Sequence, residues 1–568
     1  MKILLCSTIL CVVATSITCD TCDKWPKNYT HLVMDIIERD TCPRLKRSLS
    51  EWQFSCSKLK QLPIDEIKEN YVRGNVENAV FSEVSPVPLK TKLRLVSISR
   101  DALTDILDMD PEISDTEEFI QFIAGNKVLD SSTPLAHRYG GYQFGLWAYQ
   151  LGDGRAVSLG EYVNSKGQHW ELQLKGSGRT PYSRFGDGRA VLRSSVREFL
   201  CSEAMYYLGI PTSRAATLVV SEDPVVRDQF YKGYPKAERA AVVLRLAPSW
   251  FRFGSLEILT EYGELATLKV LVDYIIQEHF PDLKDDKNKY VQMFSDVAYK
   301  SMDLAIHWDT VGFAHGVLNT DNMSLLGITI DYGPFGFVET YDPLFVPNSS
   351  DDEKRYALCK QLEIVRWNLE KLAHALSPLL NDDERSQILD VMNSLSSYST
   401  QKRRQAFVRK LGLQQSEDSD DELITLLLQI MAETRADFTM TFRQFGEIDL
   451  TDITDKSKLD TLWSLEKLSG HRLFEDFIEL YRNRVKKEKD LTEEVRKERI
   501  LKFNPRYILR NWMAQVAIER AEDDDFTEVQ MLHEILKNPF TVQEEAEKRK
   551  FAEPPPEWSL FLRVSCSS

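Results

Sequence analysis

The chain has 568 residues, 43% of them hydrophobic and 28% charged, which is the balance of a globular protein with about two or three structural units. Its formal net charge of −16 argues against a nucleic acid as the main partner, because such binding needs clustered Lys and Arg to neutralise phosphates. A protein or a small molecule is therefore the expected substrate class.

Residues 1–16 have the pattern of a signal peptide, with one lysine, an apolar run of about 15 residues and small side chains at Ala14 and Ser16. The run is short for a membrane span, so we expect no stable span. It lacks arginine and has no evident amphipathic pattern, so a mitochondrial transit peptide fits less well than a secretory signal.

Residues 17–60 form an extension that contains four cysteines, Cys19, Cys22, Cys42 and Cys56. An even number of cysteines in a short segment is compatible with disulfides in an oxidising compartment. The alternative is four unrelated thiols in a loose extension.

The order of elements in the rest of the chain predicts an α+β fold. Residues 61–130 combine a loop rich in Val and Pro with a short helical stretch, "SRDALTDILDMD". From 131 to 255, Gly-rich turns alternate with short strand-like runs and lead into one helix. Residues 256–400 are mainly helical apart from a glycine-punctuated stretch near 311–345, and residues 401–568 are helical and strongly charged.

The hexapeptide "GDGRAV" occurs twice, at 152–157 and at 186–191. The flanking sequences differ, so we treat the two copies as separate Gly-rich turns rather than as a repeat unit. Such turns can bring backbone amides close to phosphate oxygens, although most single turns of this kind are only hairpins. The residues that could contact a nucleotide in this way are Gly152, Gly154, Arg155, Asp187 and Gly188.

The run "HWELQLKGSG" alternates apolar and polar residues and predicts a half-buried strand. Its polar face ends at Lys175, which is either a functional lysine or a solvated edge residue. The amphipathic run "RSSVREFLCSEAMYYLG" predicts a helix closed by Gly209. Glu198 in this helix is placed to pair with Lys175, as in kinases, where such a pair holds the lysine against nucleotide phosphates. The competing interpretation is a capping box of Ser195 and Glu198.

Two arginines, Arg245 and Arg252, follow an apolar strand in "VVLRLAPSWFRFGS". The planar guanidinium fork suits phosphate oxygens, although an isolated arginine is usually one half of a surface salt bridge.

The loop "HGVLNTDN", residues 315–322, resembles the kinase loop that binds a metal and deprotonates the acceptor, but Val317 occupies the position of the base. Asn322 and Asp331 supply the oxygen ligands that Mg²⁺ or Mn²⁺ selects. We expect the run "LLGITI" before Asp331 to be a strand.

Together these segments resemble the selenoprotein O family of kinase-like protein adenylyltransferases, in a member with cysteine in place of selenocysteine. The resemblance is carried by "HRYGGYQFGLWAYQLGDGRA", "LQLKGSGRTPYSRFGDGRAVLRSSVREFL", "FAHGVLNTDNM", "IDYGPFGF" and "NPRYILRNWMAQ". It extends over approximately residues 65–568, where Cys566 stands at the selenocysteine position. It implies a two-lobed protein-kinase-like fold, with residues 131–255 as one lobe and 256–400 as the other.

The resemblance also implies that ATP binds in reverse, so that AMP moves to Ser, Thr or Tyr hydroxyls of proteins and pyrophosphate leaves. It assigns Asp321 the base-like role, Asn322 and Asp331 the metal, and Glu198 the orientation of Lys175. The nucleotide would be held by Gly152, Gly154, Arg155, Lys175, Asp187, Gly188, Arg245 and Arg252.

Two features bear on regulation and location. Pro347 stands where many relatives carry a cysteine, so a disulfide from that loop to the possible redox residue Cys566 is not expected. The family resemblance implies a mitochondrial location, which is the alternative to secretory entry here. Three asparagines lie in glycosylation sequons, Asn28, Asn322 and Asn348, and a glycan on Asn322 would block the predicted metal site.

Two other functions stay open. An ordinary ATP-dependent phosphotransferase would use a similar loop, but those enzymes keep an aspartate where Val317 stands. A pseudokinase scaffold would bind nucleotide without turnover, which Val317 favours and the intact pair of metal ligands disfavours.

Overall fold

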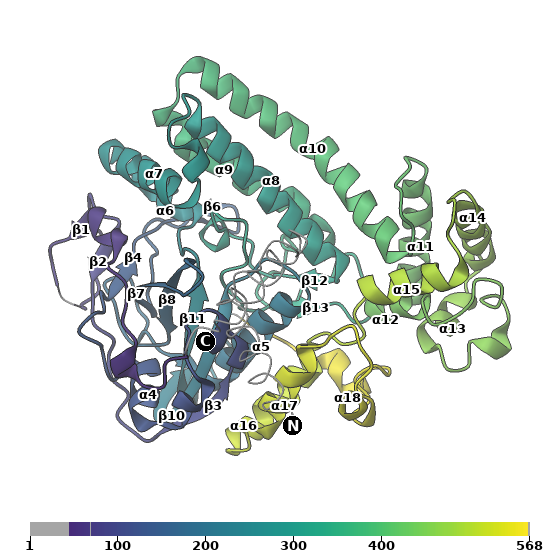
Figure 1. Cartoon of the computed structure of the whole chain (residues 1–568), viewed down its shortest axis with the longest axis horizontal. Helices are drawn as coiled ribbons and strands as arrows, with labels where there is room; N and C mark the ends of the chain where they lie inside the picture. The colour runs from purple at the N-terminus through teal and green to yellow at the C-terminus, as the bar shows by residue number, and fades with distance from the viewer. Residues whose placement is uncertain (1–44, 69, 566–568) are drawn as a thin grey trace, which may run out of the picture. The chain divides into compact units, whose positions relative to one another are not determined.

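A mixed sheet forms the centre of the amino-terminal half of the chain (Figure 1). The computed structural model describes residues 45–68 and 70–565, and those from Lys46 onward belong to one compact unit. The nine-stranded sheet has the order β1-β2-β4-β7-β8-β11-β10-β3, with β9 paired to β11. Its strands are β1 Ile64–Asp65, β2 Phe81–Glu83, β3 Leu93–Ile98, β4 Leu135–His137, β7 Ala156–Val163, β8 His169–Lys175, β9 Ala190–Val191, β10 Arg214–Arg227 and β11 Lys236–Ala247.

Helices surround this sheet and make up most of the carboxyl-terminal half. They are α3 Arg100–Asp105, α4 Glu117–Ile123, α5 Leu192–Tyr207, α6 Phe253–Glu261, α7 Leu265–His279, α8 Lys289–Thr310, α9 Gln361–Leu376, α10 Asp382–Lys410, α11 Asp420–Thr434, α12 Phe438–Gln444, α13 Trp463–Ser469, α14 Phe474–Lys486, α15 Glu493–Phe503, α16 Asn511–Glu522, α17 Thr527–Leu536 and α18 Glu544–Lys548. The mixed α+β class predicted from the sequence is confirmed. None of the helices in the described part has the length and apolar composition that a membrane span requires.

The strand β8 is the predicted strand, but both of its faces are buried. Lys175 lies opposite Ala156 of β7 and Val243 of β11, so β8 is an interior strand with neighbours on both sides. Leu172 and Leu174 enter an apolar core, as their spacing predicts. The prediction of a half-buried strand was wrong, because Glu171, Gln173 and Lys175 are only 3%, 0% and 6% exposed. The polar face meets other polar side chains instead of water.

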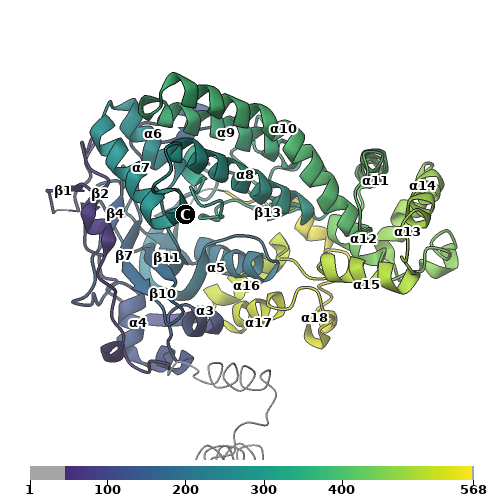
Figure 2. The ribbon, with the colours of Figure 1, turned by 45° about the horizontal axis from the view of Figure 1, so that its top comes forward.

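The helix α5 is the amphipathic helix predicted from the sequence. It begins at Leu192, so Ser195 lies inside the helix and the capping-box interpretation is wrong. Gly209 follows the helix with φ +77, a left-handed conformation that favours glycine. One side of α5 packs on β10 and β11, and the helices α16 and α17 cover another side (Figure 2).

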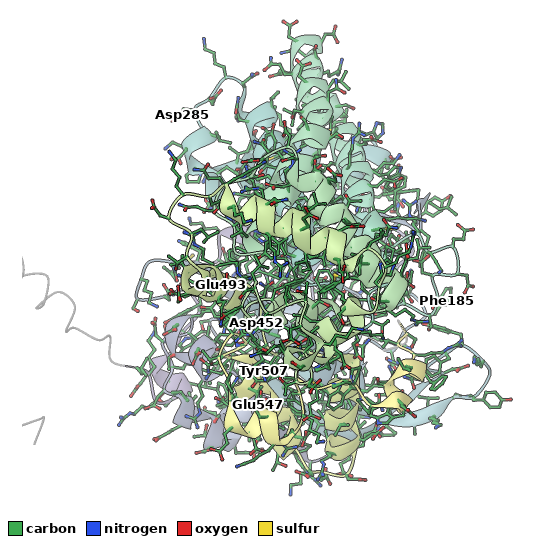
Figure 3. All side chains as sticks on the ribbon, turned by 90° about the vertical axis from the view of Figure 1, so that its right-hand side faces the viewer. Phe185, Asp285, Asp452, Glu493, Tyr507 and Glu547 are labelled. Atoms are coloured by element: carbon green, nitrogen blue, oxygen red, sulfur yellow. The ribbon has the colours of Figure 1, made fainter. Side chains whose placement is uncertain are left out.

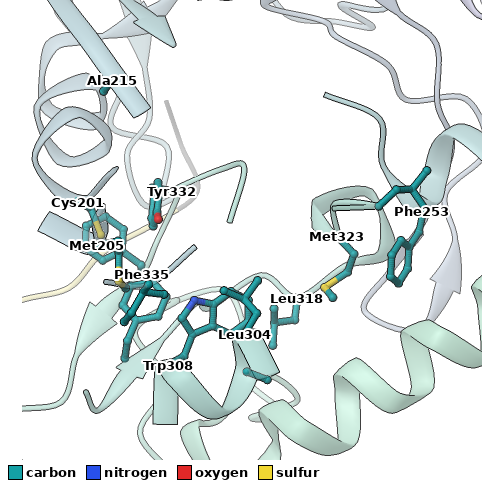
Figure 4. Close-up of a cluster of buried hydrophobic side chains, with 14 of the residues drawn as sticks. Cys201, Met205, Ala215, Phe253, Leu304, Trp308, Leu318, Met323, Tyr332 and Phe335 are labelled. Atoms are coloured by element: carbon teal, nitrogen blue, oxygen red, sulfur yellow. The ribbon is translucent and has the colours of Figure 1, made fainter. Parts of the chain in front are cut away.

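The helices α8, α9 and α10 pack together above the sheet, as Figures 1 and 2 show. Beside α8 lies a short two-stranded sheet, β12 Phe313–Ala314 with β13 Gly336–Phe337, which flanks the two predicted site loops. The predicted strand "LLGITI" was wrong. Within this run only Thr329 forms isolated bridges, to Thr212 and Met323, because the chain turns back on itself at Gly327 with φ +66. Figure 4 shows the apolar core beneath these loops, including Trp308, Tyr332 and Phe335.

Residues 46–60, predicted as part of an extension, belong to the folded unit. Trp52 is fully buried, stacks on Tyr162 with ring centroids 4.8 Å apart, and donates from Nε1 to the carbonyl of Leu107 at 2.9 Å. Cys56 is exposed and forms no disulfide within the described residues. The segment 1–16, the other three cysteines of the extension and Cys566 lie outside the described residues. Secretory entry and a redox role of Cys566 therefore stay predictions.

Residues 401–565 are mainly helical, as predicted, and Figure 3 shows this side of the molecule with Tyr507 close to Glu547. The Tyr507 hydroxyl donates to Glu547, which also accepts from Arg506 at 2.7 Å. These bonds join α18 to the segment that precedes α16.

Candidate active site

Lys175 lies at the centre of the site and contacts two carboxylates. Its Nζ pairs with Glu198 of α5 and with Asp331. Lys175 and Glu198 are buried, whereas the Asp331 side chain is 25% exposed. The predicted ion pair is therefore present, and it extends to the predicted metal ligand.

Arg245 crosses the same cluster from β11. Its Nη1 donates to Glu198 Oε1 at 2.7 Å and to the carbonyl of Ile330 at 3.0 Å, and lies 3.4 Å from Asp331 Oδ1. Burial opposes ionisation of Asp331, but the charges of Lys175 and Arg245 outweigh it and hold the pKa of that carboxyl well below its usual range. Asp331 is thus an anion at any physiological pH.

A hydrogen bond within the loop 315–322 joins the Asn322 side chain to the backbone of the same loop. Val317 replaces the expected base, yet its carbonyl accepts a hydrogen bond from Asn322 Nδ2 at 2.9 Å. This bond fixes the amide nitrogen of Asn322, and among the described residues no hydrogen bond is formed by its Oδ1. His315 is 2% exposed, and burial lowers its pKa to about 4, so the ring is neutral at pH 7.

Asp321, the residue before Asn322, is 7% exposed, and its Oδ1 is buried without a hydrogen-bond partner among the described residues. Burial raises the pKa of Asp321 to about 6 although the nearby Arg252 lowers it. Arg252 Nη1 donates to the carbonyl of Asp321 at 2.6 Å, and its guanidinium lies 4.5 Å from the centre of the Tyr139 ring. Both predicted arginines therefore reach the site.

A short hairpin covers Asp321 and was not predicted as part of the site. It consists of β5 Tyr142–Gln143 and β6 Leu146–Trp147. Gln143 Nε2 donates to Asp321 Oδ2 at 3.3 Å, and the Tyr142 amide donates to Thr320 Oγ1 at 2.8 Å. A Cβ on Gly141 would lie 2.8 Å from Asp321 Cβ, so only glycine allows this approach. The paired glycines of "YGGYQFGLW" were the available sequence signal.

The first Gly-rich turn lies beside the cluster. Asp153 is buried and accepts from Gln173 Nε2 at 3.1 Å, and Arg252 Nη2 is 3.8 Å from its Oδ1. The carbonyl of Arg155 accepts from the amide of Gly176, the residue after Lys175, at 2.7 Å, and the charge of Arg155 contributes to the lowered pKa of Asp331. Gly152 and Gly154 pack against Tyr182 and have no room for a side chain.

The second Gly-rich turn points elsewhere. Asp187 accepts from both terminal nitrogens of Arg227 at 2.7 and 2.8 Å and from the Arg189 amide at 2.9 Å. Gly188 packs against Gly178. The structure thus brings together Lys175, Glu198, Arg245, Asp331 and, through Arg252, Asp321, while the Asp187 side chain pairs with β10. Nucleotide contact by Asp187 and Gly188 stays a prediction.

The residues fit a divalent metal that also binds phosphates. Within residues 45–68 and 70–565 no group of three or more His, Cys, Asp or Glu side chains is placed to hold a metal ion. Asp331 and the available Oδ1 of Asn322 are hard oxygen donors of the kind Mg²⁺ and Mn²⁺ take, and such sites usually complete their coordination with phosphate and water.

Comparison with known proteins shows the family of the chain. Residues 68–537 match the family model described as "Protein adenylyltransferase SelO". The chain belongs to the SelO family. This SelO-family chain is 41% identical to "Protein nucleotidyltransferase YdiU" of Flavobacterium johnsoniae over 515 residues, covering 89% of this chain and 97% of the relative. It is equally 41% identical to the protein of that name from Azoarcus sp., over 90% of this chain and 97% of the relative. The resemblance seen in the sequence motifs is confirmed.

Proposed function

We propose that this SelO-family enzyme transfers AMP from ATP to Ser, Thr or Tyr hydroxyls of proteins, on a protein-kinase-like two-lobed fold. The observation that supports it most directly is the linked cluster of Lys175, Glu198 and Asp331, beside a loop that retains Asn322 and Asp321 but has Val317 at the usual base position. The cluster provides phosphate-binding charge, and the altered loop disfavours ordinary γ-phosphoryl transfer.

In the proposed reaction the acceptor hydroxyl oxygen attacks the α-phosphorus of ATP, and the bond from that phosphorus to the pyrophosphate oxygen breaks. Asp321 accepts the hydroxyl proton, since its Oδ1 has no other partner among the described residues. Lys175, Arg245 and Arg252 neutralise charge that develops on the leaving pyrophosphate. Arg155 and the first Gly-rich turn hold the nucleotide.

A divalent metal bound by Asn322 and Asp331 would supply further neutralisation of phosphate charge. The role of this chain is to present the two ligands in a fixed arrangement. Val317 fixes Asn322 through its carbonyl, and Arg245 and Lys175 fix Asp331.

The test uses purified protein, a protein acceptor such as casein, Mg²⁺ or Mn²⁺, and ATP labelled at the α-phosphate or at the γ-phosphate in parallel. We expect label on the protein from the α position alone. Label from γ alone would show a conventional phosphotransferase, and absence of both labels with ATP still bound would support the pseudokinase scaffold.

Two variants test whether the transfer reaction depends on Asp331 and Lys175. Asp331→Ala should abolish transfer and metal-dependent ATP binding, because it removes the carboxylate shared by Lys175 and the metal. Lys175→Met should weaken ATP binding without unfolding the protein, because Glu198 keeps Arg245 as a partner at 2.7 Å. A collapse of thermal stability in Lys175→Met would instead give Lys175 a structural role.

A further inference from the structure

The segment "NPRYILRNW", residues 504–512, contributes none of the residues assigned to the reaction, yet it reaches the site through the helix α16. Asn511 is the first residue of α16, and its Oδ1 accepts a hydrogen bond from Arg197 Nη1 at 3.0 Å. Arg197 is the neighbour of Glu198 in α5 and is only 8% exposed. A residue from the carboxyl-terminal region thus contacts the helix that carries the partner of Lys175.

Arg197 joins three parts of the structure at one guanidinium. Besides Asn511, it donates from Nη2 to the carbonyl of Phe335 at 2.6 Å, and its Cζ lies 4.2 Å from the centre of the Phe335 ring. Phe335 follows Asp331 by four residues in the same loop. The Nδ2 of Asn511 lies against Gly336, where an added Cβ would be 2.9 Å away. The helix α5, the Asp331 loop and α16 therefore meet at the Arg197 side chain.

The start of α16 is itself anchored. Arg510 donates from Nη1 to Asp437 Oδ2 at 2.6 Å, with both side chains almost fully buried. Asp437 also caps α12 by accepting from the Met440 amide at 2.8 Å. Asn511 follows Arg510 directly in the chain. The Arg510–Asp437 pair therefore holds Asn511 in place relative to α12.

The helices α16 and α17 also run along α5 beyond this junction. Phe199 of α5 contacts the His533 ring of α17 with ring centroids 5.1 Å apart. Gln530 of α17 donates to the carbonyl of Val96 in β3 at 2.9 Å. The carboxyl-terminal helices thus contact both α5 and the sheet on which α5 packs, which opposes any rotation of α5 away from Lys175.

We propose that Asn511 and Arg197 are positioning residues that hold Glu198 and Asp331 on either side of Lys175, so that the nucleotide site stays assembled without an activating event. Neither side chain is assigned to ATP or to the acceptor. The proposal rests on the proposed function for the identity of the ligand, ATP. In structural terms, Arg197 and Asn511 keep α5 and the Asp331 loop at a fixed distance from each other.

The chain offers a matched control in the same segment. Asn504 is fully buried, accepts from Lys410 Nζ at 2.8 Å and donates to the Lys410 carbonyl at 2.9 Å, but it contacts neither α5 nor the Asp331 loop. Asn504→Ala therefore removes a comparable set of hydrogen bonds from the carboxyl-terminal region while leaving the Arg197 junction intact.

The experiment compares Asn511→Ala, Asn511→Asp and Asn504→Ala in the full chain, measuring the dissociation constant of ATP with Mg²⁺ by calorimetry, the KM for ATP, kcat and Tm. We expect Asn511→Ala to raise the dissociation constant and KM for ATP about tenfold, as loss of one oriented hydrogen bond to a charged group does. Asn511→Asp keeps an acceptor oxygen for Arg197 and should stay within about threefold of the wild type. Asn504→Ala should lower Tm with ATP binding changed less than about twofold, since it touches nothing near Lys175.

Unchanged ATP binding in Asn511→Ala, or an equal loss in Asn504→Ala, would overturn the proposal in favour of a general stabilising role. If Asn511→Ala does not fold, Arg197→Lys replaces it, because one ammonium cannot reproduce both bonds to Asn511 and Phe335. Failure of the transfer reaction in the wild type would count against the proposed function alone, since the binding measurement tests the junction without turnover.

Discussion

The two copies of "GDGRAV" have identical sequences but different structures. In the first copy Gly152 has φ +85 and Asp153 is 3% exposed beside Arg252. In the second copy it is the other glycine, Gly188, that has a positive φ, of +73, and the Asp187 side chain is 40% exposed beside Arg227. The surroundings, not the six residues, therefore decide the backbone and the role of each copy.

The largest expected difference in activity lies between the arginines of the two copies, Arg155 and Arg189. Arg155→Ala should lower kcat/KM for ATP about 100-fold, as removal of one preorganised charge in an active site does. The reason is that the charge of Arg155 acts on both Asp331 and Lys175. Arg189→Ala should stay within about threefold, because Arg189 donates to the carbonyls of Pro88 at 3.1 Å and Gly176 at 3.5 Å. Equal losses in steady-state kinetics would remove the functional distinction between the copies.

A second effect separates the first glycines of the two copies. Gly152→Ala should destabilise the fold by about 2 kcal/mol or more, because alanine is strained at a positive φ and its Cβ would overlap the Tyr182 ring. Gly186→Ala should cost less than about 1 kcal/mol, since Gly186 is exposed and the nearest atom to its Cβ is Ser183 O at 3.1 Å. Urea unfolding followed by tryptophan fluorescence measures both, and similar midpoints for the two variants would contradict the assigned backbones.

The smallest expected difference in activity lies between the aspartates of the two copies, Asp153 and Asp187. Asp153→Asn should reduce transfer about tenfold. The amide oxygen can keep the bonds from the His137 backbone amide at 3.2 Å and from Gln173 Nε2 at 3.1 Å, but the NH2 group then replaces the charged oxygen that lies 3.8 Å from Arg252 Nη2. Asp187→Asn should alter activity by less than about threefold, since an exposed ion pair contributes little. A strong loss of ATP affinity in Asp187→Asn would mean that this carboxylate leaves Arg227 when nucleotide binds, and it would support the nucleotide-binding role that the family resemblance implies for Asp187.

Local periodicity predicted the elements that carry the site. The spacing of apolar residues identified β8 and α5, and the analogy with the lysine–glutamate pair of kinases predicted the pairing of Lys175 with Glu198. Local periodicity could not show that Gln173 is buried, because its partners come from distant segments, Arg245 of β11 and Asp153 of the first Gly-rich turn.

Other features depended on contacts that no local pattern carries. The turn at Gly327 replaced the expected strand before Asp331, and Trp52 entered the core through a stacked partner, Tyr162, far along the chain. The hydrogen bond from Gln143 to Asp321 joins residues that are 178 positions apart in the sequence. Such long-range contacts are set by the assembled fold, so the sequence alone identifies the chemical groups more readily than the residues that orient them.

The two sequon asparagines near the site use the same nitrogen that an oligosaccharide would occupy. Asn322 Nδ2 donates to the carbonyl of Val317, and Asn348 Nδ2 donates to the carbonyl of Gly316 at 3.0 Å while Asn348 is only 2% exposed. In a secretory compartment, sugar transfer and folding would therefore compete for these two amides. A chain that folds first protects both nitrogens, whereas a chain modified first loses a bond that closes the loop at Val317. Mapping of glycans at Asn322 and Asn348 in a secreted chain would then report which process was faster, and molecules modified at Asn322 would be the inactive fraction.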